Sequence, residues 1–117
     1  MATTPTFYLD QRLVGEWENE YFTFVFEGDG TGSFSFHGYE QIHWQIVWVM
    51  RDGRLYEYGY IDGVREGEFV SGYTFTANEL QLTLLKQRFL EFRDYGEVWS
   101  AWSYSTEWET LILQRVR

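Results

Sequence analysis

The side chains able to do chemistry in this sequence are two histidines, scattered serines and a surplus of carboxylates. His37 and His43 are the only histidines, so three histidine ligands cannot meet at a metal, and their spacing does not by itself bring two rings to one ion. No serine sits in a Gly-x-Ser-x-Gly turn, and the absence of cysteine removes thiolate ligands and a cysteine nucleophile. We therefore expect no catalytic residue, no metal site and no cofactor.

Two further patterns are typical of functional motifs but have simpler explanations. Glu16, Glu18 and Glu20 recur at every second residue, and like charges at that spacing can raise a carboxyl pKa. With 18 acidic residues in the chain, such a series arises by chance. The glycine-rich segment 28–32 is not a phosphate loop, because no helix pattern or lysine follows it and Asp29 would repel a phosphate. The sequence therefore predicts a protein that is not an enzyme.

Strands are the elements expected to position the side chains, because apolar and polar residues alternate with a period of two and no long stretch has a helical period. The clearest strands are expected at Tyr21–Glu27, Ser33–His37, Gln41–Met50, Arg54–Tyr60, Glu68–Thr76 and Leu80–Leu85. Further strands are expected at Gly15–Glu18, Glu97–Tyr104 and Trp108–Val116. A short helical turn is expected within Phe7–Leu13, and Lys86–Asp94 fits either a strand or a helical turn.

Short turns connect these strands, among them the glycine-containing pairs Asp52-Gly53 and Asp62-Gly63. About eight to nine strands in chain order predict an all-β fold, a single small antiparallel up-and-down β-barrel in which closure removes exposed sheet edges. The whole chain, residues 1–117, is expected to form one domain, with residues 1–6 disordered.

Composition restricts the partners. The chain has 9 Lys and Arg against 18 Asp and Glu, a net charge of −9, and its cations are dispersed, so nucleic-acid phosphates and anionic lipids are repelled. The longest apolar stretch, Ile46–Met50, is far shorter than the roughly 20 residues of a membrane helix. Met1–Thr6 lacks the basic and apolar regions of a signal peptide. We expect a soluble, cytoplasmic protein with no membrane span and no nucleic-acid partner.

Four segments resemble a known family when they are taken in chain order. Leu13–Trp17, with the sequence Leu-Val-Gly-Glu-Trp, is similar to the Leu-x-Gly-x-Trp opening of the short bacterial lipocalin-like domains in the calycin superfamily. Asp29–Gly32 resembles the Asp-Gly-Thr-Gly hairpin of these domains, Tyr73–Leu84 their late hairpin and Leu111–Arg115 their closing strand. The resemblance spans most of the chain.

The resemblance implies a lipocalin-like barrel in which Trp17 plugs the closed end. A cation from the last strand then packs over the indole ring, and Arg115 occupies the matching position. This pair is expected to be structural. Typical ligand-carrying lipocalins are longer than 117 residues, so a smaller lumen is implied.

The aromatic surplus is the strongest indication of function, with 6 Trp, 9 Tyr and 10 Phe in the chain. An eight-stranded barrel either fills its interior with side chains or holds one small ligand there. The resemblance favours a small apolar or aromatic ligand in the barrel mouth. The rings expected to bind it are Phe24, Phe26, Trp44, Trp48 and Tyr58.

A second hypothesis is an acidic protein-binding module, such as an inhibitor or immunity-type protein that covers a basic site on a partner. Trp99 and Trp102 have opposite parity, so a regular strand would place one of them outside the barrel, where tryptophan is favoured in binding surfaces. Aromatic rings that face inward favour the ligand, and rings that face outward favour the partner.

Overall fold

The computed structural model describes residues 7–38, 43–93, 96–104 and 110–117, and nearly all of their regular structure is antiparallel strand. The elements are η1 (Gln11–Leu13), β1 (Gly15–Glu18), β2 (Phe22–Phe26), β3 (Thr31–Phe36), β4 (His43–Arg51), β5 (Arg54–Ile61), β6 (Val64–Phe75), β7 (Glu79–Arg93), β8 (Gly96–Trp99), β9 (Ser103–Tyr104) and β10 (Leu111–Arg115). No helix in these residues is long and apolar enough to cross a membrane.

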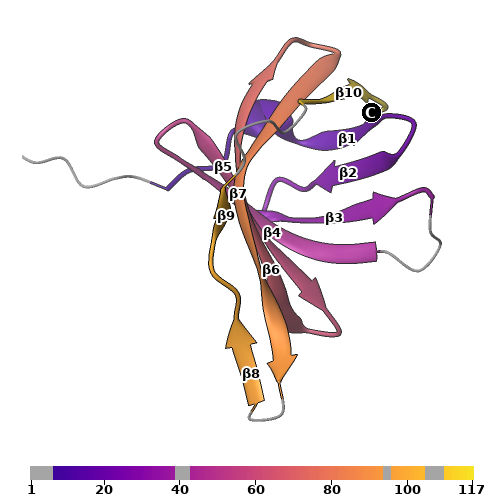
Figure 1. Cartoon of the computed structure of the whole chain (residues 1–117). Helices are drawn as coiled ribbons and strands as arrows, with labels where there is room; N and C mark the ends of the chain where they lie inside the picture. Colours follow the sequence, from indigo (N-terminus) through magenta and orange to yellow (C-terminus); the bar gives the residue numbers. More distant parts are fainter. Residues whose placement is uncertain (1–6, 39–42, 94–95, 105–109) are drawn as a thin grey trace, which may run out of the picture.

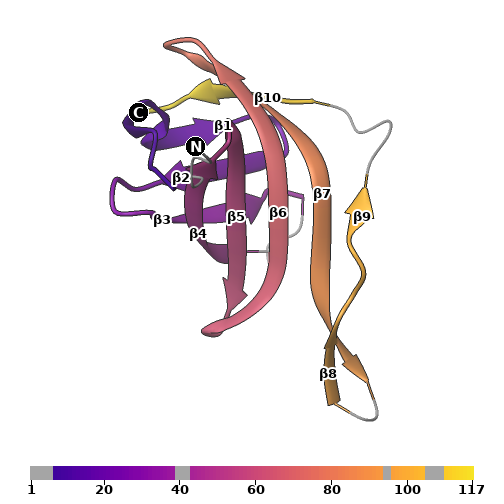
Figure 2. The ribbon, with the colours of Figure 1, turned by 90° about the vertical axis from the view of Figure 1, so that its left-hand side faces the viewer.

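The strands close into an eight-stranded barrel. Neighbouring strands follow the chain from β1 to β7, and β10 pairs with both β1 and β7 to complete the ring (Figure 1). The remaining part of β7 runs beyond β10 and pairs with β9 and β8, which lie beside it as an outer extension (Figure 2). The predicted all-β, up-and-down barrel with a short helical turn near residue 11 is therefore confirmed.

Two-residue turns set which side of β5 faces the interior. Asp52 and Gly53 both have positive φ, 53° and 73°, which is the geometry of a tight hairpin whose twist matches that of the strands. The turn opposes Met50 to Leu55, so alternate residues of β5 share the inner face with those of β4. The inner series of β5 is Leu55, Glu57 and Gly59, and the outer series is Tyr56, Tyr58 and Tyr60.

One end of the barrel is a packed core. Its fully buried side chains are Leu13, Trp17, Phe26, Trp48, Met50, Leu55, Leu80 and Leu113. The Arg115 guanidinium lies 4.1 Å from the centre of the Trp17 ring, which is the contact that the resemblance implies. Arg115 also donates to the backbone carbonyls of Arg12, Val14 and Ala77, and the Trp17 indole N–H donates to that of Leu13. The helical turn, the first strand and the last strand are thus fastened together at the plug.

Several strand boundaries differ from the predicted ones: β3 begins at Thr31 rather than Ser33 and β6 at Val64 rather than Glu68. The segment Glu97–Tyr104 is two strands rather than one, because Ser100 Oγ accepts the N–H of Phe89 and so replaces a backbone acceptor in the ladder. Lys86–Arg93 is the second half of β7, which settles the choice between strand and helical turn. Residues 1–6, expected to be disordered, lie outside the described residues, as do Asp94 and the beginning of the predicted strand Trp108–Val116.

Candidate functional site

A cavity of about 330 Å³ occupies the barrel interior beyond the packed end. Its aromatic wall consists of Phe22, Phe24, Phe34, Trp44 and Phe69. Its aliphatic wall consists of Ile46, Leu82, Leu84 and Leu111. Only Glu57, Ser71 and Gln87 are polar among the described residues of the lining. The volume lies at the lower end of the range for small-molecule sites.

The cavity has a buried inner end and a more accessible outer end. Phe24, Ile46, Glu57, Ser71 and Leu82 are buried, and they lie next to the packed core. The other lining residues, Phe22, Phe34, Trp44, Phe69, Leu84, Gln87 and Leu111, are half-buried. A small molecule entering at the half-buried rim would therefore meet the Glu57 carboxyl near the bottom.

The aromatic wall is a continuous set of ring contacts on β2 and β3. Phe24 and Phe34 are directly opposite in register, and their ring centres are 4.9 Å apart. Phe22 stacks on Phe34 at 5.4 Å. Cross-strand aromatic pairs stabilise a sheet and hold each other in place. This wall is consequently a preformed surface of ring faces and edges.

Trp44, the register partner of Phe34 on β4, extends the aromatic wall, and two glycines leave room for its indole ring. A Cβ atom added at Gly59 would lie 2.3 Å from Trp44 Cε3, and one at Gly67 would lie 3.0 Å from Trp44 Cζ3. Gly59 and Gly67 face each other across β5 and β6. Glycine inside a strand often marks such a close approach. The ring also meets Phe69 edge-on at 6.2 Å, which fixes its position at the rim.

Glu57 is the unusual residue of the lining. Its position in β5 lies between Trp48 on β4 and Phe69 on β6, and only 5% of its surface is exposed. Within the described part of the chain the carboxyl makes no hydrogen bond and no ion pair. Burial without a compensating charge raises the pKa of Glu57 to about 8.

Ser71 and Gln87 complete the polar part of the cavity. Gln87 faces Phe69 from β7, so Glu57, Phe69 and Gln87 form one row across three strands. Ser71 lies two residues beyond Phe69 on the same face of β6. Neither residue carries a charge, and the described lining holds no lysine, arginine or histidine. The negative charge of an ionised Glu57 thus has no counterion in this lining.

The ligand-binding residues predicted from the sequence fall into three places. Phe24 and Trp44 line the cavity, whereas Phe26 and Trp48 are buried in the packed end. The Trp48 indole N–H donates to two backbone carbonyls, of Glu27 and Thr31. Tyr58 lies on the outer face of β5, where the Arg65 guanidinium sits 4.5 Å from its ring centre, so this ring is not part of the cavity wall.

The partner-binding candidates Trp99 and Trp102 are brought together rather than separated. The strand ends at Trp99, so the alternation that would separate the two rings does not continue to Trp102. The Arg88 guanidinium lies 5.1 Å from the centre of the Trp99 ring and 4.5 Å from that of the Trp102 ring. Lys86 also lies 4.4 Å from the Trp102 ring. Both indoles are half-buried on the outer face of the barrel, and binding of a basic protein there stays a prediction.

The two histidines lie on the outer side of the sheet and bond to neighbouring hydroxyl groups. His37 pairs with Thr23, and His43 pairs with Ser35 at 2.8 Å. The described residues contain no group of three or more His, Cys, Asp or Glu side chains placed to hold a metal ion.

Comparisons with protein-family models, with curated proteins and with solved structures found no match for this chain.

Proposed function

We propose that the protein is a non-enzymatic, lipocalin-like binding protein that holds a small apolar or aromatic molecule inside its barrel. The observation that carries the proposal is the cavity of about 330 Å³ with an aromatic wall and a half-buried rim. The plug formed by Trp17 and Arg115 supports the lipocalin-like assignment, because it joins the opening and closing strands in the manner that the sequence resemblance implies.

The polar groups of the lining favour binding over catalysis. They are one carboxyl, one hydroxyl and one amide, on Glu57, Ser71 and Gln87. The Ser71 hydroxyl has no hydrogen-bonded base among the described residues, and such a base is what activates a serine nucleophile. A few fixed polar groups in an apolar pocket are typical of sites that orient a ligand.

Apolar contact alone gives a modest affinity. A ring system that loses about 200 Å² of apolar surface to the cavity gains at most about 5 kcal/mol, which corresponds to a Kd of about 0.2 mM. Tighter binding requires a polar contribution from the few polar groups of the lining.

The proposal is tested by titrating the protein with N-phenylnaphthylamine, a neutral probe whose fluorescence rises in apolar surroundings. We expect saturable enhancement with the native chain and its loss in Leu84→Trp, because Leu84 lines the cavity and the larger ring fills it. The control is Val47→Trp, which adds the same ring on the outer face of β4, where Val47 is exposed.

A second filling variant, Ser71→Leu, guards against misfolding of the first, and circular dichroism checks the fold of each. Absence of saturable binding to the native chain, or equal binding by both folded filling variants, contradicts the proposal.

A further inference from the structure

We propose that the ligand is an aromatic or apolar amine, bound as its ammonium form with the charged nitrogen against the Glu57 carboxylate at the inner end of the cavity. The inference rests on the proposed function and names the chemical class of the ligand.

Glu57 differs from the other buried carboxyls of the described residues in its lack of a cationic partner. Asp10 and Glu68 are also buried, and each is paired with an arginine, Asp10 with Arg12 at 2.8 Å and Glu68 with Arg88 at 2.7 Å. Buried charges in proteins are paired or neutralised, because an isolated one is strongly destabilising. Glu57 has neither an arginine nor a hydrogen bond among the described residues. Its partner is therefore sought in what enters the cavity.

The electrostatic character of the inner end also favours a cation. The faces of aromatic rings attract cations, and Phe24 is buried with Glu57 at the inner end of the cavity. Ring faces and one carboxylate together favour a positive charge attached to an apolar body. The net charge of −9 also attracts cations from solution and repels anions.

The cavity volume limits the size of the ligand. A cavity of about 330 Å³ holds a body of one or two rings with a short side chain, and it leaves little space for a larger hydrophobe. With the rings against the aromatic wall, the short side chain points to the inner end, where Glu57 and Ser71 are buried. Ser71 is then available as a hydrogen-bond acceptor for a second ammonium proton.

The pairing has a pH signature. Trp48 and Phe69 face Glu57 from the strands on either side, and neither side chain titrates. The rest of the described lining contains no other titratable group. Because burial raises the pKa of Glu57 to about 8, this carboxyl is mostly protonated at pH 6 in the ligand-free protein. An ammonium ion that binds against it at pH 6 must displace the carboxyl proton. Affinity for an amine should therefore rise roughly fifty-fold from pH 6 to pH 8.

The test is isothermal titration calorimetry with three probes of the same shape: naphthylmethylamine, naphthylmethanol and naphthoate. We expect the native chain at pH 8 to bind the amine about tenfold or more tightly than the alcohol, with the naphthoate weakest. Glu57→Gln should remove the preference for the amine and its pH dependence, while binding of the alcohol changes by less than about threefold. The control is Glu97→Gln, which changes the net charge equally at an exposed position on β8.

The outcomes separate this inference from the proposed function. Equal or tighter binding of the alcohol, or persistence of the amine preference in Glu57→Gln, overturns the amine assignment and leaves the apolar cavity standing. Failure of all three probes, together with failure of the neutral fluorescent probe, overturns both proposals.

Discussion

Glu57 and Glu68 lie on neighbouring strands of one sheet and face opposite sides of it. Glu57 on β5 opposes Phe69, and Glu68 on β6 opposes Tyr58, so the two carboxyls are one residue out of phase. Their exposed fractions are nearly equal, 5% and 7%. The difference lies in their partners, which burial alone does not reveal.

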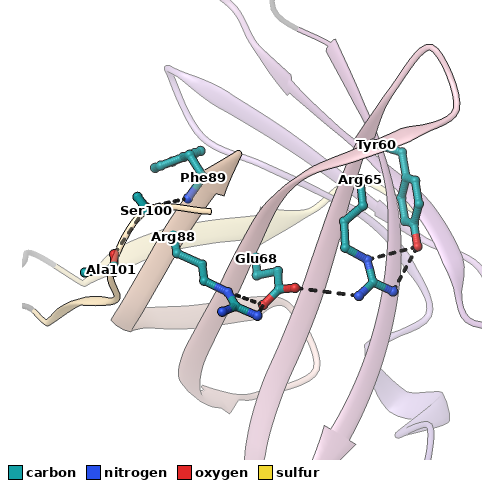
Figure 3. Close-up of polar contacts among 7 residues, drawn as sticks. All are labelled: Tyr60, Arg65, Glu68, Arg88, Phe89, Ser100 and Ala101. Atoms are coloured by element: carbon teal, nitrogen blue, oxygen red, sulfur yellow. Dashed lines mark hydrogen bonds and ion pairs between the residues drawn. The ribbon is translucent and has the colours of Figure 1, made fainter. Parts of the chain in front are cut away.

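On the outer face, the chain itself supplies counterions for Glu68. Arg88 approaches the carboxylate at 2.7 Å and Arg65 at 3.6 Å, and Arg65 also donates to the Tyr60 hydroxyl (Figure 3). On the inner face, the described lining around Glu57 is apolar except for Ser71 and Gln87, and it brings no cation. The contrast shows that the ionised outer carboxyl has its counterions within the chain, whereas an ionised inner carboxyl has no counterion among the described lining residues.

The largest expected effect is on the pH dependence of stability. The pKa of Glu57 is raised to about 8 in the folded chain. Between the lower pKa of this group in the unfolded chain and pH 8, the unfolded state binds fewer protons than the folded state. The free energy of unfolding therefore falls as the pH rises through this window. Glu57→Gln removes this loss. The variant should match the native chain near pH 4 and exceed it by about 4 kcal/mol at pH 8.

Urea denaturation followed by tryptophan fluorescence at the two pH values measures that difference. If the free energies of unfolding of the native chain and Glu57→Gln changed in parallel with pH, burial would not destabilise the ionised inner carboxyl. Glu57 and Glu68 would then not differ in the way proposed.

The same substitution at Glu68 should have the opposite sign. Glu68→Gln takes the charge from between two arginines that are 32% and 45% exposed, so solvent compensates part of the loss. We expect the free energy of unfolding to fall by about 1–2 kcal/mol at pH 7. The measurement is the same urea titration, and a stabilised Glu68→Gln would mean that desolvation outweighs pairing on the outer face as well.

Most of the barrel was predictable from local patterns. Alternation placed Phe22, Phe24 and Phe26 on one face of β2, and glycine-containing turns located the hairpins. The pair Trp17 and Arg115 followed from the family resemblance, because the motif fixes its position at the plug.

The inner face of β5 shows why Glu57 is not among the predicted site residues, although Phe24 and Trp44 are. Tyr56, Tyr58 and Tyr60 are the more apolar series, and hydrophobicity alone would turn them inward. The two-residue turn decides otherwise, since it ties Leu55 to Met50 and so places Glu57 in the cavity. Register counted across the Asp52-Gly53 turn places Glu57 on the inner face together with Leu55.

Other parts of the site depend on irregularities that leave little trace in the sequence. The register of β7 against β6 shifts between Val70 and Ser71, so that Leu84 and Gln87 both line the cavity although they are three residues apart. This shift breaks the period-two pattern at Leu85, whereas Lys86–Asp94 lacks a clear assignment because its apolar residues Phe89, Leu90 and Phe92 stand among charged ones. A bulge of this kind arises from how two strands fit together, which one segment alone does not encode.

The smallest expected effect distinguishes the two arginines on the outer face. Double-mutant cycles of Glu68→Gln with Arg88→Met and with Arg65→Met isolate each pair from the stacking of Arg88 on Trp99 and Trp102. We expect a coupling energy of about 1 kcal/mol for Arg88, which also donates through Nε at 2.7 Å, and of less than about 0.5 kcal/mol for the longer and more exposed Arg65 contact. Both coupling energies should weaken in concentrated salt, because exposed ion pairs are screened.

Equal coupling energies for the two arginines would mean that Glu68 responds to the summed positive potential of the outer face and not to one hydrogen-bonded arginine. A single ammonium ion held by Glu57 would then be a poor analogue of the outer pair.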